Sequence, residues 1–158
     1  KFKFDPSKYE VDQFFSESKD GTKIPYFQIS RRDMIKNSKN PTLLYGYGGF
    51  EISLTPSYLS AFSRKWIDEG GVYVIANIRG GGEYGPEWHQ SALKSNRQRA
   101  YDDFISVAEE LIKKEVTSPS NLGIRGGSNG GLLVGAVFTQ RPDLFNAVVC
   151  AVPLLGYV

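Results

Sequence analysis

The sequence predicts an α/β fold, in which a mostly parallel sheet carries helices on both faces. From residue 42 onward, apolar strand-like runs alternate with stretches of helical periodicity, and the connections between them are short. Such alternation favours parallel strands with helices packed on both sides of the sheet. A serine flanked by glycines, at 126–131, stands between one apolar run and the helix-like run that follows it. This turn therefore falls at the carboxyl end of a predicted strand, where α/β sheets bind ligands.

Residues 1–41 differ from the rest of the chain and are predicted to form a β-hairpin lead-in and a linker. Two β-rich runs flank Asp20 and Gly21. An Asp-Gly pair in this setting predicts a tight primed turn with positive φ at both positions. Pro25 has no amide hydrogen and therefore predicts an edge strand. We divide the chain on these grounds into the lead-in, 1–41, and a main α/β unit, 42–158.

The boundaries of the helices in the main unit follow from capping signals. Thr55 is a predicted N-cap with a proline in the first turn. The glycine pair that starts at Gly70 is expected to end that helix. Ser95 and Gln98 are spaced as a capping box for the next helix. The predicted buried face of this next helix comprises Tyr101, Phe104, Ile105, Ala108, Leu111 and Ile112.

The turn around Ser128 matches the G-x-S-x-G pattern of a nucleophile elbow, with Gly126 and Gly130 as its glycines. In an elbow the chain reverses sharply from strand to helix, which strains the serine backbone and exposes its hydroxyl. Side chains two residues before or after the serine would collide with the neighbouring strand or helix, so glycine is favoured there. The alternative is a glycine-rich turn in which Ser128 only caps a buried helix. The strand before it and the helix after it favour the elbow, so Ser128 is the candidate nucleophile.

The base that would activate Ser128 cannot be found after it in this sequence. In α/β-hydrolases the catalytic residues follow one another in the order serine, acid, histidine. Thirty residues follow Ser128, and none of them is histidine. The only carboxylate among them, Asp143, is expected to close the elbow helix. The single histidine, His89, precedes the serine, against the order of this fold. We interpret it as a structural loop residue beside Trp88, with the catalytic base as the alternative.

Two further glycine-rich turns also fall at the carboxyl ends of predicted strands. The turn that begins at Arg79 lacks the lysine of a P-loop and the spacing of a dinucleotide turn. Arg79 and Glu83 are predicted to tie neighbouring strand ends together. In the other turn, Tyr47 is either a packed aromatic or a hydroxyl donor to an oxyanion. Phe50 is either a core residue or an apolar wall beside the serine, and the residues alone leave both questions open.

Composition and charge exclude several classes of partner. A net charge of +2 without a basic cluster predicts neither nucleic-acid nor membrane binding, and no apolar stretch resembles a membrane span or signal peptide. Asp102 and Asp103 are expected on the solvated face of a helix rather than at a metal site. The single cysteine, Cys150, excludes an internal disulfide and a cysteine-based metal site, and its apolar neighbours predict a small core residue. The lack of an internal disulfide agrees with a cytoplasmic location.

Taken together, these motifs make the chain closely resemble the prolyl oligopeptidase family. The motifs span nearly the whole chain in the order and spacing of the family. Asn129 favours the subgroup of prolyl endopeptidases, because the related oligopeptidases with basic specificity more usually carry alanine after the serine. The segments that carry the resemblance are 19–25, 45–50, 77–85, 126–133 and 140–145.

The resemblance implies a serine peptidase that cleaves short proline-containing peptides on the carboxyl side of proline. Ser128 is then the nucleophile that forms the acyl-enzyme. The oxyanion hole pairs the hydroxyl of Tyr47 with the backbone amide of Asn129. Phe50 corresponds to an aromatic residue that lines the pocket for the substrate's proline. No cofactor and no metal are implied.

The resemblance also shows where this chain departs from the family. The family's catalytic Asp and His lie beyond the position of Val158, and a β-propeller precedes the hairpin. We therefore expect the chain to be the first part of a catalytic domain, inactive by itself, and to self-associate through an exposed sheet edge. Two alternatives stay open. One is an esterase or aminopeptidase-like α/β-hydrolase, and the other is a non-catalytic interaction domain on the same fold.

Overall fold

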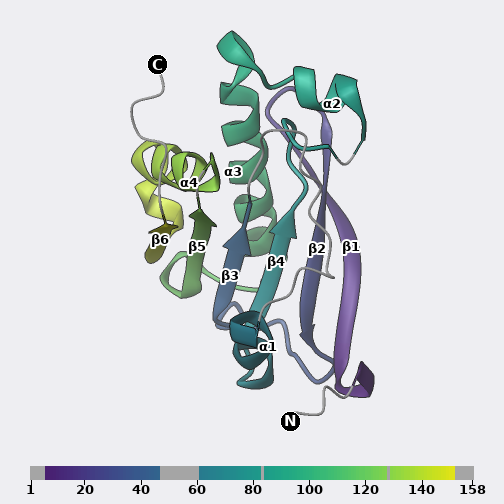
Figure 1. The fold of residues 1–158 in the computed structure, drawn as a ribbon. Helices are drawn as coiled ribbons and strands as arrows, with labels where there is room; N and C mark the ends of the chain where they lie inside the picture. The colour runs from purple at the N-terminus through teal and green to yellow at the C-terminus, as the bar shows by residue number, and fades with distance from the viewer. Residues whose placement is uncertain (1–5, 47–60, 83, 128, 152–158) are drawn as a thin grey trace.

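The described part of the computed structural model, residues 6–46, 61–82, 84–127 and 129–151, forms one continuous six-stranded sheet (Figure 1). The strand order is β1-β2-β4-β3-β5-β6. β3, β4, β5 and β6 run parallel, whereas β2 pairs antiparallel with both β1 and β4. The predicted mostly parallel sheet is therefore confirmed. The strands are β1 Tyr9–Glu17, β2 Lys23–Arg31, β3 Thr42–Tyr45, β4 Val72–Ala76, β5 Leu122–Gly127 and β6 Ala147–Ala151.

Helices cover both faces of this sheet, as the sequence predicts. Strand residues alternate in direction, so each strand contributes to two separate cores. Leu43 and Tyr73 belong to the core beneath α1, whereas Leu44 and Val74 belong to the larger core beneath α3 and α4. Phe104 of α3 is fully buried in the larger core. The helices are α1 Ala61–Asp68, α2 Pro86–Gln90, α3 Gln98–Lys113 and α4 Asn129–Gln140. Short 3-10 turns lie at Pro6–Lys8, Lys94–Asn96, Pro119–Asn121 and Pro142–Leu144.

The β1–β2 hairpin is confirmed, but its turn differs from the predicted one. The connection covers five residues, from Ser18 to Thr22, and the Ser18 amide donates to the Thr22 carbonyl at 2.8 Å. Gly21 has a φ of +85°, whereas Asp20 keeps a negative φ. A two-residue primed turn needs positive φ at both positions. The longer loop removes that need, and the Asp20 carboxylate accepts a hydrogen bond from the Thr22 amide at 3.1 Å.

Pro25 does not lie on an edge strand, so that prediction was wrong. β2 pairs with β1 on one side and β4 on the other, and β1 is the edge at this end of the described sheet. The ladder between β2 and β4 begins only at Tyr26, one residue after Pro25. Proline is tolerated there because its missing amide lies before the ladder, while its carbonyl accepts a hydrogen bond from Asn77 at 2.9 Å.

The end of α1 follows the prediction. The helix ends at Asp68, and Gly70 adopts a φ of +94°, a conformation that favours glycine. The amides of Gly70 and Gly71 donate to carbonyls of the last helical turn at 3.0 and 2.9 Å. The predicted N-cap Thr55 lies outside the described residues.

The start of α3 contradicts the predicted capping box. Ser95 lies inside the 3-10 turn Lys94–Asn96, and α3 begins at Gln98 with Arg97 at the N-cap position and no side-chain capping bond. The 3-10 turn runs directly into the helix, so Ser95 lies too far upstream to cap it. The Gln98 side chain instead bonds to Asp102 of its own helix at 3.0 Å.

The hairpin strands share one sheet with the main unit, because β2 pairs directly with β4. The division of the chain at residue 41 stays a prediction. No helix in the described ranges combines the length and the apolar character needed to cross a membrane.

Candidate active site

The carboxyl ends of β3 and β5 lie side by side at one edge of the sheet. The two strands pair in parallel, and Tyr45 at the end of β3 is opposite Arg125. Gly46 follows directly and is buried between α3 and α4. A Cβ atom on Gly46 would lie 2.7 Å from the Phe104 ring and 3.1 Å from the Leu133 side chain. The backbone that leads to Tyr47 therefore packs against the helix that follows Ser128.

The turn from β5 to α4 has the tight geometry that a nucleophile elbow requires. β5 ends at Gly127 and α4 begins at Asn129, so one residue separates the strand from the helix. A Cβ atom on Gly126 would lie 2.5 Å from the carbonyl carbon of Gly130, 3.0 Å from its Cα, and would overlap its carbonyl oxygen. The φ of Gly126 is not in the left-handed region. Lack of space, rather than backbone conformation, therefore requires glycine at this position.

Three of the four predicted site residues, Ser128, Tyr47 and Phe50, lie outside the described residues. Asn129 is the first residue of α4, so its backbone belongs to the amino-terminal turn of that helix. The first amides of a helix have no partner within the helix and form its positive end. An amide in this position is suited to donate to an oxyanion. The roles of the four residues stay predictions.

His89 holds the loop that follows β4. His89 lies in α2, and its Nδ1–H donates to the carbonyl of Gly80 at 2.7 Å. Trp88 supports the same loop, since its indole N–H donates to the Ile78 carbonyl at 3.0 Å and its carbonyl accepts from the Gly80 amide at 3.1 Å. Figure 1 shows α2 on the β2–β4 side of the molecule and α4 on the β5–β6 side. This arrangement agrees with the structural interpretation of His89.

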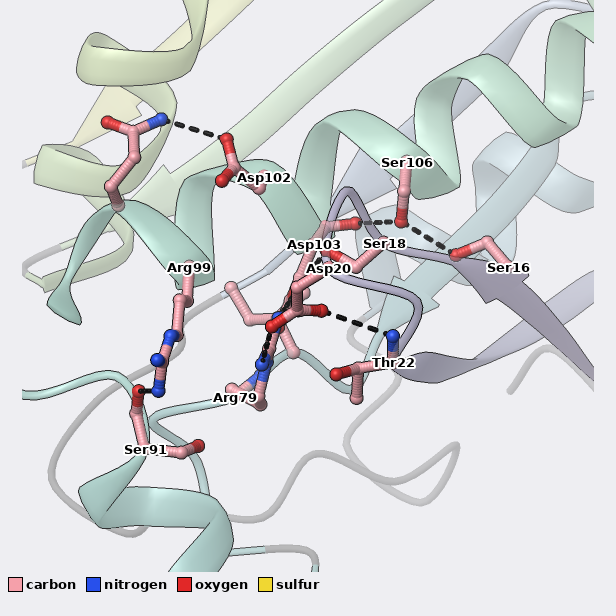
Figure 2. A network of polar contacts seen from close by, with 12 residues as sticks. Ser16, Ser18, Asp20, Thr22, Arg79, Ser91, Arg99, Asp102, Asp103 and Ser106 are labelled. Atoms are coloured by element: carbon pink, nitrogen blue, oxygen red, sulfur yellow. Dashed lines mark hydrogen bonds and ion pairs between the residues drawn. The ribbon is translucent and has the colours of Figure 1, made fainter.

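Arg79 is buried at the centre of a polar network that joins three elements, in which Asp103 is buried and Asp20 is exposed (Figure 2). Its guanidinium donates to Asp103 of α3 at 2.8 and 3.0 Å, and to Asp20 of the hairpin turn at 2.6 and 3.1 Å. The hydroxyl of Ser18 donates to Asp103 at 2.6 Å. Arg79 therefore ties the end of β4 to the hairpin and to α3, as predicted for this residue. Glu83, its predicted companion, lies outside the described residues.

The expectation that Asp103 is solvated is wrong, because Asp103 is fully buried. The burial is possible because Arg79 and Ser18 satisfy its carboxylate. The missed signal lies in the helical spacing. Asp103 stands three residues after Ala100 and four before Val107, both on the buried face of α3. The neighbouring Asp102 is partly exposed and accepts from Gln98 at 3.0 Å.

Hydrogen bonds within this network shift the pKa values of Asp20 and Arg79. The hydrogen bond from Arg79 holds the pKa of Asp20 well below its ordinary range. The hydrogen bond to Asp103, followed by that to Asp20, raises the pKa of Arg79 above its ordinary value. Asp20 and Arg79 therefore form an ion pair near neutral pH.

An apolar groove of about 560 Å³ lies on the α1 face of the sheet, near the amino ends of β3, β5 and β6. Phe62, Trp66, Arg125 and Val149 contribute to its walls. It lies away from the carboxyl ends, where the sequence predicts the site. Cys150 of β6 is exposed, which corrects the expectation of a core residue. Its strand is an edge of the described sheet, so apolar neighbours in sequence do not bury it.

The described ranges contain no group of three or more His, Cys, Asp or Glu side chains that could hold a metal ion. A mostly parallel sheet covered on both faces, with a G-x-S-x-G turn entering a helix, defines the α/β-hydrolase class.

Comparison with known proteins narrows this class. Residues 57–157 match the prolyl oligopeptidase family, and the chain belongs to this family. It is 56% identical to an uncharacterized peptidase of Sinorhizobium fredii, over 99% of this chain and 22% of the relative, and 50% identical to the prolyl endopeptidase of Dictyostelium discoideum, over 96% and 20%. A solved post-proline cleaving enzyme from Rickettsia typhi superposes with a TM-score of 0.94 at 53% identity, over 98% of this chain and 22% of that enzyme. The chain thus spans about a fifth of the length of these relatives.

Proposed function

We propose that the protein carrying this chain is a serine oligopeptidase that cleaves short peptides on the carboxyl side of proline. The observation that carries the proposal is the backbone contact between Gly126 and Gly130, which a nucleophile elbow requires around Ser128. Similarity to a post-proline cleaving enzyme and to a prolyl endopeptidase supports proline as the residue before the cleaved bond. The same similarity and the single cysteine are consistent with a cytoplasmic location.

The proposed mechanism assigns one task to each predicted residue. The hydroxyl of Ser128 gives its proton to a general base and attacks the carbonyl carbon of the substrate's proline. The bond from this carbon to the next residue's nitrogen breaks, the leaving amine takes up the proton from the base, and the acyl-enzyme forms. The Asn129 amide and the Tyr47 hydroxyl donate to the oxyanion, and removing one such donor typically costs about 10²–10³ in kcat. Phe50 forms an apolar wall against the proline ring. Water then hydrolyses the acyl-enzyme and releases the shortened peptide.

The base for this reaction is proposed to come from outside these 158 residues. The sequence contains one histidine, His89, which lies in α2 on the β2–β4 side of the molecule, whereas α4 lies on the β5–β6 side (Figure 1). A serine without its base loses several orders of magnitude in rate. We therefore expect the 158-residue chain by itself to show no turnover.

The test is hydrolysis of a blocked Gly-Pro chromogenic amide by the 158-residue chain and by a polypeptide extended to the length of the relatives. Ser128→Ala in the extended polypeptide removes the nucleophile. Ser120→Ala, an exposed serine in the turn Pro119–Asn121, is the matched control. We expect turnover only in the extended protein, lost in Ser128→Ala and kept in Ser120→Ala.

Other outcomes would redirect the assignment. Turnover by the short chain that disappears in His89→Gln would make His89 the base and overturn the incomplete triad. Hydrolysis of acyl esters without preference for proline would favour an esterase. A folded extended protein that is silent towards both amides and esters would favour a non-catalytic interaction domain.

A further inference from the structure

Three consecutive glycines, Gly80 to Gly82, follow β4 at the carboxyl edge of the sheet. Glycines have no side chains with which to pack, and they lose more conformational freedom on ordering than other residues. Gly80 also adopts a φ of +99°. Yet Gly80 and Gly81 are buried. The conformation of this glycine segment must therefore be fixed by the residues on either side of it.

On one side, α2 holds the segment. The Gly80 amide donates to the Trp88 carbonyl, and the Gly80 carbonyl accepts from His89. Both bonds act on the first glycine. These bonds do not fix the direction in which the chain enters the glycine segment.

On the other side, Arg79 is held through its backbone and its side chain at once. Its amide donates to Asp103 Oδ2 at 3.0 Å, and its Nε donates to the same oxygen at 3.0 Å. Its remaining guanidinium bonds reach Asp103 and Asp20 in the fork geometry that only arginine provides (Figure 2). The residue that enters the glycine segment is therefore oriented by two carboxylates from distant parts of the chain.

A gain in stability does not explain this arrangement well. Buried ion pairs are often no more stabilising than apolar side chains of similar volume, because desolvation offsets their attraction. The ion pair between Arg79 and Asp103 instead holds Arg79 in one orientation at the carboxyl ends of the strands, where the predicted site lies. β4 pairs with β3, with Ile75 opposite Tyr45, and the chain reaches Tyr47 two residues after Tyr45.

We propose that Arg79 is a positioning residue. Clamped between Asp103 and Asp20, it fixes the glycine segment 80–82 and the adjoining carboxyl end of β4, beside the strand that leads to the oxyanion donor Tyr47. The catalytic part of this inference rests on the proposed function. Asp20 acts through Arg79 and touches no reacting atom.

The first experiment measures hydrogen exchange of the amides of residues 78–82 in the extended protein. Asp20→Asn removes one carboxylate from the clamp but keeps the hairpin residue similar in size. We expect the exchange rate of these amides to rise about tenfold, since losing a hydrogen bond to a charged group changes the equilibrium between closed and open states by about that factor. The matched control is Arg141→Lys, because Arg141 also bonds two carboxylates, those of Glu109 and Asp143, but on an exposed surface.

The second experiment compares kcat and KM for the Gly-Pro amide under conditions where circular dichroism shows every variant folded. Arg79→Lys keeps the charge but loses the fork. We expect kcat to fall by up to about 10²-fold, the cost of misplacing catalytic groups by about 1 Å. KM stays within about threefold. Adding Asp20→Asn to Arg79→Lys is expected to change kcat little further, because both act on one clamp.

The outcomes separate this proposal from the proposed function. Unchanged exchange at 78–82 in Asp20→Asn, or an equal change in Arg141→Lys, overturns the clamp. Faster exchange with unchanged kcat in Arg79→Lys overturns the positioning role and leaves a structural one. A silent but folded unsubstituted protein overturns the proposed function and with it the catalytic part of the inference, while exchange still decides whether Arg79 fixes the segment.

Discussion

Replacing Gly126 by alanine removes the space on which the elbow depends. The added methyl carbon would lie 2.5 Å from the carbonyl carbon of Gly130 and 3.0 Å from its Cα. Contacts between carbon atoms are optimal at about 3.5–4.0 Å. The end of β5 and the start of α4 must therefore separate by about 1 Å. Both contacting groups are backbone, so no side-chain rotation can relieve the overlap.

This separation has two measurable consequences. Overpacking of a close-packed site costs about 1–3 kcal/mol, which urea unfolding of the extended protein reports as a lower midpoint. Ser128, the proposed nucleophile, is the residue between the two elements in the sequence, and an error of about 1 Å in the position of a catalytic group lowers kcat by about 10²-fold. Steady-state hydrolysis of the Gly-Pro amide measures the second effect.

Two glycines of the same region provide matched controls. Gly123 lies in the same strand, and a Cβ atom there would meet its nearest described neighbours at 3.6 Å, an ordinary contact. Gly135 lies within α4, and a Cβ atom there would meet no described atom within 4 Å. Alanine is expected to be tolerated at Gly123 and to stabilise by up to about 1 kcal/mol at Gly135. If Gly126→Ala unfolded and turned over like Gly123→Ala, the elbow geometry argued for this turn would be refuted.

Three further predictions follow from the buried network and from the sheet edge. Asp103→Ala leaves the Arg79 charge buried without its main partner, so the free energy of unfolding should fall by about 3–5 kcal/mol. Urea unfolding measures this loss, and a loss below about 1 kcal/mol would contradict the prediction. Because its pKa is lowered by Arg79, Asp20 stabilises the fold above its unfolded pKa of about 3.9 and loses this contribution as pH falls. Asp20→Asn should therefore flatten the plot of unfolding free energy against pH below about pH 5. Parallel plots for the variant and the unsubstituted protein would contradict this. The isolated 158-residue chain should self-associate through β6, an edge of the described sheet, where Val149 is 49% exposed. Val149→Lys should lower the average mass measured by light scattering. A chain that stays monomeric at high concentration would contradict this prediction.

Local patterns in the sequence were sufficient wherever the deciding forces act between near neighbours. Helical periodicity predicted the buried face of α3, and the glycine pair Gly70 and Gly71 predicted where α1 ends. The need for glycine at Gly126 was predictable because strand, turn and helix meet within five residues. The prediction of a primed hairpin turn was wrong because the turn type depends on the length of the whole loop. A loop of five residues needs less strained backbone, and the Asp-Gly pair cannot by itself reveal the loop length.

The sequence by itself determined the alternation of strands and helices, and the position of Ser128 between the glycines of an elbow. Only the tertiary structure decided that Pro25 lies in an inner strand, that Cys150 is exposed and that Asp103 is buried with Arg79. These properties depend on the order of strands in the sheet and on which distant segments meet. A hairpin turn, a strand end and a helix far apart along the chain supply the charges of one network. The buried charges of Arg79 and Asp103 are compensated only because each lies against the other.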